Sequence, residues 1–283
     1  MSIPKGGVGF FDSGIGGLTV LSACRKVLPK EVFYYLGDNG HAPYGNLKEE
    51  EIMRYVRKAM EKFVRLQARA VVIACNTATA VCIEKLRQEY LFPIIGAEPA
   101  VFAAAKKGGE ILVLTTRATY NSPRFQALCV RAGESFPNSL VKPIPCDVLA
   151  GTIEKCLLEK DFDFTLLLPK GKPNGVVLGC THYVYIEEVV KRYYGCEVYH
   201  GNEGIANRLR AVLKKGVEGA DFYKKQGETT TDIHGGNFSK KKGLFWKKKA
   251  VKKEKNSFFE NIYFLGKYGK INKKRHKQMF VPK

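Results

Sequence analysis

Short apolar runs alternate with longer amphipathic stretches along most of this 283-residue chain. Runs rich in β-branched and aromatic residues indicate buried strands, whereas apolar positions three or four residues apart indicate helices. The predicted strands span residues 8–11, 32–36, 70–74, 93–95, 110–114, 140–144 and 175–178. The predicted helices span residues 18–27, 48–66, 118–131, 149–158, 183–194 and 201–215. This alternation predicts an α/β fold with mainly parallel sheets flanked by helices.

An internal repeat links two of the predicted strands. The segment 71–77, VVIACNT, is matched 105 positions later by the segment 176–182, VVLGCTH. Two similar halves that each end a strand at a cysteine predict two pseudo-symmetric domains with the active site in the cleft between them. We place the crossing near Gly96, which gives a first domain over 1–96, completed by about 206–223, and a second over 97–205. Residues 224–283 then form an atypical lysine-rich tail.

The two repeated cysteines, Cys75 and Cys180, suggest acid/base chemistry. In open α/β sheets, ligands bind outside the carboxyl ends of the strands, where helix N-termini present free N–H groups. Such an N-terminus stabilises a thiolate, so we expect each thiol to act as a base near neutral pH. If the cysteines face each other across a cleft, one removes a proton from a ligand and the other returns one, which inverts a stereocentre.

Proton exchange of this kind requires stabilisation of a carbanion but does not require a nucleotide cofactor. The developing carbanion must be strongly stabilised. No nucleotide is needed, and the chain shows no GxGxxG fingerprint, P-loop or pyridoxal-binding signature. We therefore expect neither a cofactor nor a metal.

Polar residues near the N-terminal strands are candidate ligand contacts with ordinary structural alternatives. Asp12 and Ser13 follow the first predicted strand and could cap the next helix instead of contacting a ligand. Tyr44 and Gly45 follow Pro43 in a sequence that is typical of a turn. Position along the chain leaves both alternatives open.

Polar residues beside the two cysteines carry the same ambiguity. Asn76, Thr77 and Thr181 could cap helices or hold a carboxylate. His182 could be a structural histidine, or it could orient Cys180 or share protons with it.

The composition narrows the cellular context. No stretch approaches the roughly 20 consecutive apolar residues that a membrane-spanning helix needs, and no signal-peptide pattern opens the chain. We expect a cytoplasmic protein without a membrane partner. The eight cysteines form no CxxC pair, which argues against a zinc ribbon. Six of them match no catalytic motif and are predicted to be structural: Cys24, Cys82, Cys129, Cys146, Cys156 and Cys196.

Positive charge is concentrated in the C-terminal tail. The chain carries 47 Lys+Arg against 27 Asp+Glu, a formal net charge of +20. Residues 224–283 hold 18 Lys+Arg against 4 Asp+Glu, or +14, which leaves 29 against 23, or +6, for residues 1–223. The body is only mildly basic, so the total charge does not by itself indicate a nucleic-acid-binding protein.

Four motifs, taken together and in this order, resemble the bacterial glutamate racemases. They are FDSGIGGL at 11–18, PYG at 43–45, ACNTA at 74–78 and LGCTHY at 178–183. The resemblance implies two related α/β domains with the active site between them. It also implies cofactor-independent interconversion of L- and D-glutamate for peptidoglycan synthesis, and commonly a homodimer.

The resemblance also assigns roles by position. Cys75 would take the α-proton of D-glutamate, and Cys180 that of L-glutamate. Asp12 and His182 would assist Cys75 and Cys180 respectively, and Glu154 matches a family glutamate near the second cysteine. The residues implied to bind substrate are Asp12, Ser13, Tyr44, Gly45, Asn76, Thr77, Thr181 and His182.

The match ends near residue 223. Members of the family usually close with a short segment and a helix on the first domain, whereas this chain continues into the lysine-rich tail. An altered gene end and a disordered solubilising tail are favoured over a segment that binds nucleic acid. Two other functions stay open: an aspartate or hydantoin racemase with the same two cysteines, and a nucleic-acid-binding protein with an inactive racemase body.

Overall fold

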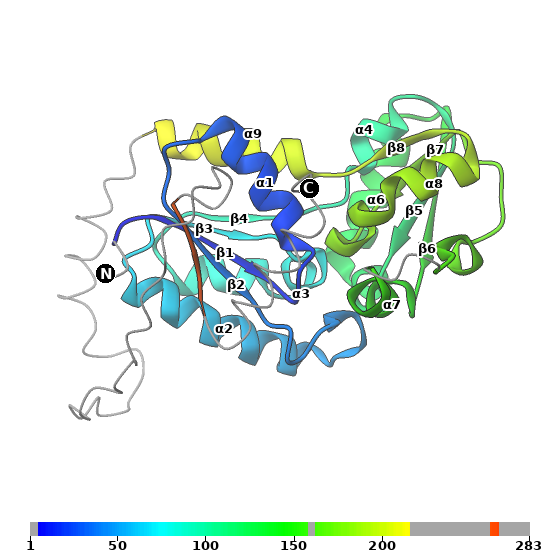
Figure 1. The fold of residues 1–283 in the computed structure, drawn as a ribbon. Helices are drawn as coiled ribbons and strands as arrows, with labels where there is room; N and C mark the ends of the chain where they lie inside the picture. Colours follow the sequence, from blue (N-terminus) through cyan, green and yellow to red (C-terminus); the bar gives the residue numbers. More distant parts are fainter. Residues whose placement is uncertain (1–4, 158–161, 216–260, 266–283) are drawn as a thin grey trace.

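Two parallel β-sheets divide the molecule into two units (Figure 1). The computed structural model describes residues 5–157, 162–215 and 261–265. The first sheet contains β1 (Val8–Asp12), β2 (Phe33–Gly37), β3 (Ala70–Ile73), β4 (Ile94–Gly96) and β9 (Ile262–Phe264). The second sheet contains β5 (Gly109–Thr115), β6 (Ser139–Pro145), β7 (Gly175–Leu178) and β8 (Glu197–Tyr199). All paired strands are parallel, which confirms the predicted α/β class.

The strand order places the repeated strands inside their sheets. The order is β4-β3-β1-β2-β9 in the first unit and β6-β5-β7-β8 in the second. The strands that lead into the two cysteines, β3 and β7, therefore have a hydrogen-bonded neighbour on each side. Such strands hold the residues that follow them in a fixed position.

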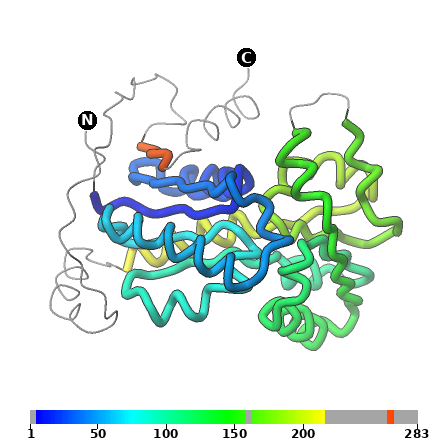
Figure 2. The backbone as a smooth tube through the Cα atoms, turned by 90° about the horizontal axis from the view of Figure 1, so that it is seen from below, coloured from blue at the N-terminus to red at the C-terminus, as the bar shows by residue number. Residues whose placement is uncertain are grey.

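Helices cover both faces of each sheet (Figures 1 and 2). In the first unit, one face is covered by α2 (Glu49–Arg65) and α3 (Asn76–Glu89), and the other by α1 (Gly17–Val27) and α9 (Asn202–Lys214). In the second, one face carries α7 (Leu149–Cys156), η3 (Thr181–Ile186) and α8 (Glu187–Tyr194), and the other α4 (Val101–Ala105) and α6 (Pro123–Ser135). Short helices elsewhere are η1 (Tyr44–Asn46), α5 (Arg117–Asn121) and η2 (Phe164–Leu167). Across the described ranges, no helix has the length and apolar character needed to cross a membrane.

Alternation along β1 divides the core of the first unit into two layers. Successive side chains of a strand point to opposite faces. Phe10 packs edge to face on Phe33 at 5.5 Å between ring centroids, in the layer beneath α1 and α9. Phe11 lies 6.0 Å from the ring of Tyr44, in the layer beneath α2 and α3. Both phenylalanines are fully buried, so both helical layers are anchored on the same strand.

The first unit is built from separate segments of the chain. The chain leaves the first sheet after β4, near Gly96, and enters the second at β5. It returns after β8, and Ile205 and Leu209 of α9 pack into the layer around α1. Figure 2 shows this return, with α9 in yellow beside the blue and cyan segments. Residues 216–223, which we expected to help complete this unit, lie outside the described residues.

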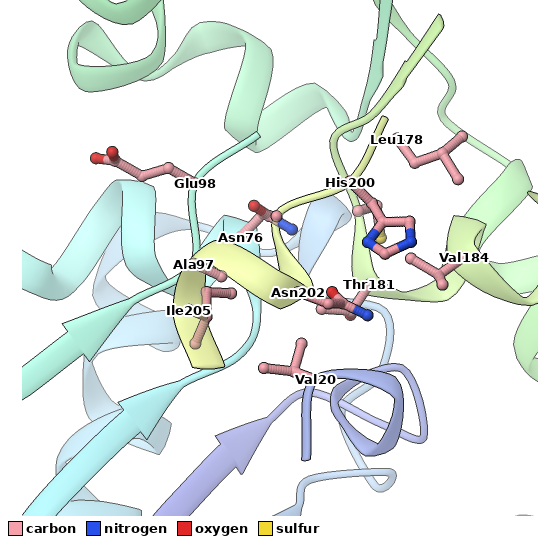
Figure 3. A pocket seen from close by; sticks show the side chains of 12 residues that line it. Val20, Asn76, Ala97, Glu98, Leu178, Thr181, Val184, His200, Asn202 and Ile205 are labelled. Atoms are coloured by element: carbon pink, nitrogen blue, oxygen red, sulfur yellow. The ribbon is translucent and has the colours of Figure 1, made fainter. Parts of the chain in front are cut away.

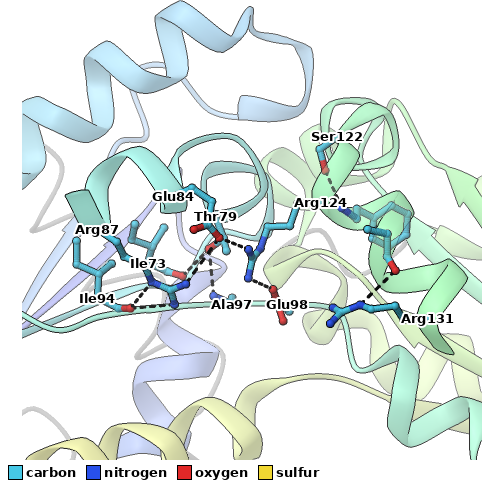
Figure 4. A network of polar contacts seen from close by, with 12 residues as sticks. Ile73, Thr79, Glu84, Arg87, Ile94, Ala97, Glu98, Ser122, Arg124 and Arg131 are labelled. Carbon is cyan, nitrogen blue, oxygen red and sulfur yellow. Dashed lines mark hydrogen bonds and ion pairs between the residues drawn. The ribbon is translucent and has the colours of Figure 1, made fainter. Parts of the chain in front are cut away.

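An arginine network ties the units together at the first crossing (Figure 4). Arg124 of α6 pairs with Glu84 of α3 and with Glu98 in the segment between β4 and α4. On the first-unit side, the Thr79 hydroxyl donates to the Ile73 carbonyl at 3.1 Å. The helix that begins beside Cys75 is therefore linked to both the crossing segment and the second unit.

Two helices differ from the prediction for residues 118–131 and 183–194. The first is divided into α5 and α6 because Pro123 holds Ser122 in an extended conformation, with φ −72° and ψ 133°. The Ser122 hydroxyl then caps α6 by accepting from Phe125 N–H at 3.2 Å. The second begins as the 3₁₀ helix η3 and becomes α-helical only at Glu187.

The strand β9 was not predicted, and it lies within the segment assigned to the tail. Its residues pair with β2 from Phe33↔Ile262 to Tyr35↔Phe264. Ile262 is 9% exposed and joins the core layer around α1, and Phe264 packs beside it. The lysine runs at 240–242 and 247–249 lie outside the described residues.

Truncation after residue 223 is expected to lower the free energy of unfolding by about 2–4 kcal/mol, because it exposes the apolar surface that β9 covers. Urea denaturation followed by circular dichroism measures this loss. A chain ending after residue 265 keeps β9 and should unfold at the urea concentration of the full chain. Equal midpoints for all three proteins would show that β9 contributes nothing to stability.

Candidate active site

Cys75 and Cys180 occupy equivalent places in the two units. β3 leads into Cys75, which is the N-cap of α3. β7 leads into Cys180, which is the N-cap of η3. Both side chains are buried, with relative exposures of 5% and 7%. The expected position of the cysteines at strand ends is therefore confirmed.

The glycine-rich turn after β1 brings the two units into contact. Asp12 accepts hydrogen bonds from Gly14 N–H at 2.9 Å and, across the junction, from the Thr181 hydroxyl at 3.0 Å. The absence of a side chain at Gly16 permits this approach. A Cβ there would overlap the Thr181 hydroxyl and lie 2.8 Å from the backbone nitrogen of His182. The turn therefore packs directly against the start of η3.

The Cys75 thiol faces Ser13 and the first turn of α3. Its sulfur accepts from Ala78 N–H at 3.4 Å and lies 3.7 Å from the Ser13 hydroxyl oxygen. Burial raises the pKa of Cys75 to about 12, the charges of Asp12 and Cys180 act in the same direction, and the hydrogen bond from Ala78 opposes them. Desolvation at this thiol therefore opposes the helix N-terminus, which we expected to favour a thiolate near neutral pH.

A partly buried pair, His182 and Glu154, stands beside Cys180. His182 Nδ1 lies 3.8 Å from the Cys180 sulfur, and Nε2 lies 2.6 Å from Glu154 Oε2. Burial alone would lower the pKa of His182, but its hydrogen bonds with Cys180 and Glu154 raise it well above the usual value. The protonated ring donates from both nitrogens. Cys180 therefore has a cationic donor next to its sulfur.

Asp12 is a buried carboxyl whose charge affects Cys75 and which accepts a hydrogen bond from Thr181, the residue after Cys180. Its side chain is fully buried. Burial raises the pKa of Asp12, whereas the positive charge of His182 and hydrogen bonds from Gly14, Gly17 and Thr181 lower it. This carboxyl is consequently placed to exchange protons more readily than an ordinary surface aspartate.

A threonine cluster was missed in the sequence analysis apart from Thr77. The Thr77 hydroxyl lies 2.9 Å from that of Thr116 and 3.3 Å from that of Thr119. Thr116 also lies against η1. A Cβ added at Gly45 would be 2.7 Å from the Cβ of Thr116. Thr116 follows β5 just as Asp12 ends β1. Its position after a predicted strand was the signal that could have identified it.

Tyr44 is held by a polar contact that the sequence analysis did not predict. Its side chain is buried, and its hydroxyl donates to Asp38 Oδ2 at 2.7 Å. The same carboxylate contacts His41 Nδ1 at 2.9 Å. The loop between β2 and η1 therefore sets the orientation of the Tyr44 ring.

A small pocket lies where the chain crosses between the units (Figure 3). Asn76, Cys180 and Thr181 line it together with Glu98 and His200 from the two crossing segments. The pocket thus reaches Cys180 and Asn76, and its lining does not include Cys75. Within the described ranges, no three His, Cys, Asp or Glu side chains are grouped so that they could hold a metal ion.

The other six cysteines sit in the protein interior or at its margin. None of the eight forms a disulfide. Four are buried and two are partly exposed: Cys24, Cys82, Cys129 and Cys146, then Cys156 and Cys196. Burial raises the pKa of Cys24 and Cys82 to about 12.

Known proteins are similar to this chain in both sequence and fold. The family model of the Asp/Glu/hydantoin racemases matches residues 19–209. A glutamate racemase from Clostridium botulinum is 39% identical over 224 residues, which cover 76% of this chain and 86% of the relative. One from Clostridium perfringens is 37% identical over 229 residues, covering 77% and 87%.

Solved structures agree with these relatives. The Escherichia coli glutamate racemase, in complex with L-glutamate and the activator UDP-MurNAc-Ala, aligns with a TM-score of 0.67 and 29% identity, covering 75% of this chain and 83% of that one. A glutamate racemase isoform from Bacillus anthracis aligns with a TM-score of 0.65 and 31% identity over the same shares.

Two α/β units with a buried cysteine at the matched strand end of each define a protein of the racemase class. The chain belongs to the Asp/Glu/hydantoin racemase family. Within it, the curated relatives place the chain among the glutamate racemases.

Proposed function

We propose that this protein interconverts L- and D-glutamate by exchange of the α-proton between two bases, Cys75 and Cys180. The observation that carries the proposal is the presence of a buried thiol at the matched strand end of each unit, each with its own polar partners. A pair of bases on opposite sides of one carbon is the simplest arrangement for inversion.

The proton balance of the reaction closes on the two cysteines. One cysteine, as a thiolate, takes the α-proton and becomes a thiol, and the substrate becomes a carbanion whose charge spreads into the α-carboxylate. The opposite cysteine, as a thiol, gives its proton to the other face and becomes a thiolate. In the resemblance-based assignment, Cys75 starts the reaction of D-glutamate and Cys180 that of L-glutamate. The reverse reaction, which begins from the other enantiomer, returns both cysteines to their starting protonation states.

The substrate itself would help to ionise Cys75. A thiol with a pKa near 12 is a poor base at neutral pH. The α-ammonium of a bound amino acid brings a positive charge into the buried site, and a nearby positive charge favours the thiolate. Ligand binding and activation of the base would therefore be coupled.

Polar groups around the thiols would hold the two carboxylates of glutamate. Ser13, Asn76, Thr77 and Thr181 are buried at the strand ends beside the cysteines. Their hydroxyl and amide groups donate hydrogen bonds to carboxylates. The linked hydroxyls of Thr116 and Thr77 would supply further donors.

The product and partners follow from the same proposal. D-glutamate formed in this way would supply peptidoglycan synthesis. The homodimer implied by the resemblance stays a prediction, and sedimentation equilibrium would measure it. Nucleic-acid binding by the tail would involve the lysine runs at 240–242 and 247–249, which lie outside the described residues.

Proton exchange in D₂O tests the function directly. The purified protein is incubated with L-glutamate without added cofactor, while optical activity and the α-proton NMR signal are followed. We expect optical activity to disappear as deuterium enters the α-carbon, with much slower exchange of L-aspartate. Faster exchange of L-aspartate or of a hydantoin would reassign the substrate, and a folded protein that exchanges none of them would contradict the proposal.

A further inference from the structure

Glu154 forms hydrogen bonds with residues of both units. It lies on α7 of the second unit, and its Oε2 contacts His182 Nε2 at 2.6 Å. Two other partners come from the first unit. Ile15 N–H donates to Oε2 at 3.3 Å, and the Asn39 side-chain amide donates to Oε1 at 2.7 Å. The carboxylate therefore has hydrogen-bond partners in the first unit as well as His182 in its own unit.

Asn39 lies in a short turn whose backbone is anchored to the first sheet. It follows β2 in a turn closed by a hydrogen bond from His41 N–H to the Asp38 carbonyl at 3.0 Å. The turn is anchored to the end of β1, since Asp38 N–H donates to the Asp12 carbonyl at 2.9 Å. The backbone that carries Asn39 is therefore tied to the end of β1, and its side chain reaches Glu154 from there.

The orientation of the Asn39 amide is set by Glu154. Only the NH₂ group can donate to a carboxylate, so Nδ2 must face Oε1. The amide oxygen Oδ1 is buried and has no hydrogen-bond partner among the residues the structure describes. A buried acceptor without a partner is unfavourable. The contact with Glu154 is therefore the interaction that this side chain is placed to make.

We propose that Asn39 is a positioning residue for the second base, which holds Glu154 against His182 so that the Glu154–His182 pair is aligned beside Cys180 only when the two units are closed. This inference rests on the proposed two-base function. Asn39 touches neither Cys180 nor His182 in the described contacts and acts through Glu154. Closure of the units would then be coupled to alignment of the Glu154–His182 pair beside Cys180.

The effect of Asn39 on the pKa of His182 can be tested, because the charged groups that act on His182 are known. The groups that face it are Cys180 and Glu154, which form hydrogen bonds with it, and Asp12, whose pKa the charge of His182 lowers. Removing the amide of Asn39 leaves all three in place and removes one hydrogen bond from Glu154. A looser Glu154 stabilises the imidazolium less, so His182 should lose its proton at a lower pH.

The first measurement needs no substrate. The His182 ring resonance, assigned with a His182→Gln variant, is titrated by NMR in the wild-type protein and in Asn39→Ala. We expect its titration midpoint to move to lower pH in Asn39→Ala. Asn207→Ala, which removes an exposed asparagine of α9 beside Arg210, is the matched control and should leave the midpoint unchanged. An unchanged midpoint in Asn39→Ala would overturn the proposal.

The second measurement locates the effect at one of the two bases. Primary isotope effects are measured with α-deuterated L- and D-glutamate. In Asn39→Ala, we expect kcat/KM to fall at least about tenfold. The isotope effect should rise for the enantiomer whose proton Cys180 takes and fall for the other. Cys180→Ser and Cys75→Ser identify which enantiomer belongs to which base. Equal changes for both enantiomers would overturn the proposal.

Asn39→Asp separates positioning from packing. Aspartate has the size of asparagine but presents an anion to Glu154 instead of a donor. We expect at least as great a loss as in Asn39→Ala, whereas a packing role predicts activity close to wild type. If the wild-type protein exchanges no glutamate proton, the proposed function fails, and the NMR titration still decides whether Asn39 positions Glu154.

Discussion

Alanine at either Cys75 or Cys180 is expected to reduce racemisation of glutamate by at least about a thousandfold, in the upper part of the range for loss of a positioned acid or base. Inversion needs a proton taken from one face and another delivered to the opposite face. Either variant keeps one base and lacks the other. Any deuterium that still enters the α-carbon must therefore do so with retention of configuration.

The measurement pairs circular dichroism with NMR on the same sample. Circular dichroism reports inversion, and loss of the α-proton signal reports exchange. Cys82→Ala is the matched control, because Cys82 is a buried cysteine on α3, the helix that Cys75 caps, and plays no part in the proposed reaction. It should retain activity and lose only some stability. Undiminished inversion in Cys75→Ala or Cys180→Ala would exclude the two-cysteine mechanism.

Gly16→Ala is expected to lower kcat/KM by about a hundredfold or more by preventing closure of the units. Gly16 has φ −56° and ψ −40°, so alanine fits the backbone without strain. The added Cβ would instead meet the Thr181 hydroxyl and lie 2.8 Å from the His182 backbone nitrogen. Backbone atoms of η3 cannot rotate away, so the units must move apart. A displacement near 1 Å in a catalytic site is enough for a loss of this size.

Gly204→Ala provides the control for this glycine. Gly204 lies in α9, and a Cβ there would meet no atom within 4 Å. Alanine in a helix is more favourable than glycine by roughly 0.5–1 kcal/mol, so this variant should be slightly more stable and fully active. Far-UV circular dichroism should show both variants folded. Wild-type kcat/KM in Gly16→Ala would mean that the close approach of the glycine turn to η3 is not needed for catalysis.

Local patterns were sufficient to predict much of the architecture. Period-2 and period-3.6 hydrophobic spacing depends only on neighbouring residues, and it located the strands from β1 to β7 and the long helix α2. The repeat of a strand that ends at cysteine located Cys75 and Cys180 at equivalent strand ends. Both inferences succeeded because each used a signal contained within a few consecutive residues.

Other features depend on contacts between segments far apart in the chain. The short strand β9 is held by its parallel pairing with β2, more than 200 residues away. Thr116 meets Thr77 only because the two units are closed, and Asn39 meets Glu154 for the same reason. No local pattern carries these pairings, since each is produced by the packing of whole elements.

The protonation of the site was also decided by tertiary structure. The sequence placed Cys75 at the end of a predicted strand, where a helix N-terminus would favour a thiolate. The degree of burial is not visible there, and it raises the pKa of the same thiol to about 12. The local sequence thus specified the fold class and the two cysteines, whereas desolvation and hydrogen bonds, which exist only after packing, shift the pKa values of Cys75, Asp12 and His182.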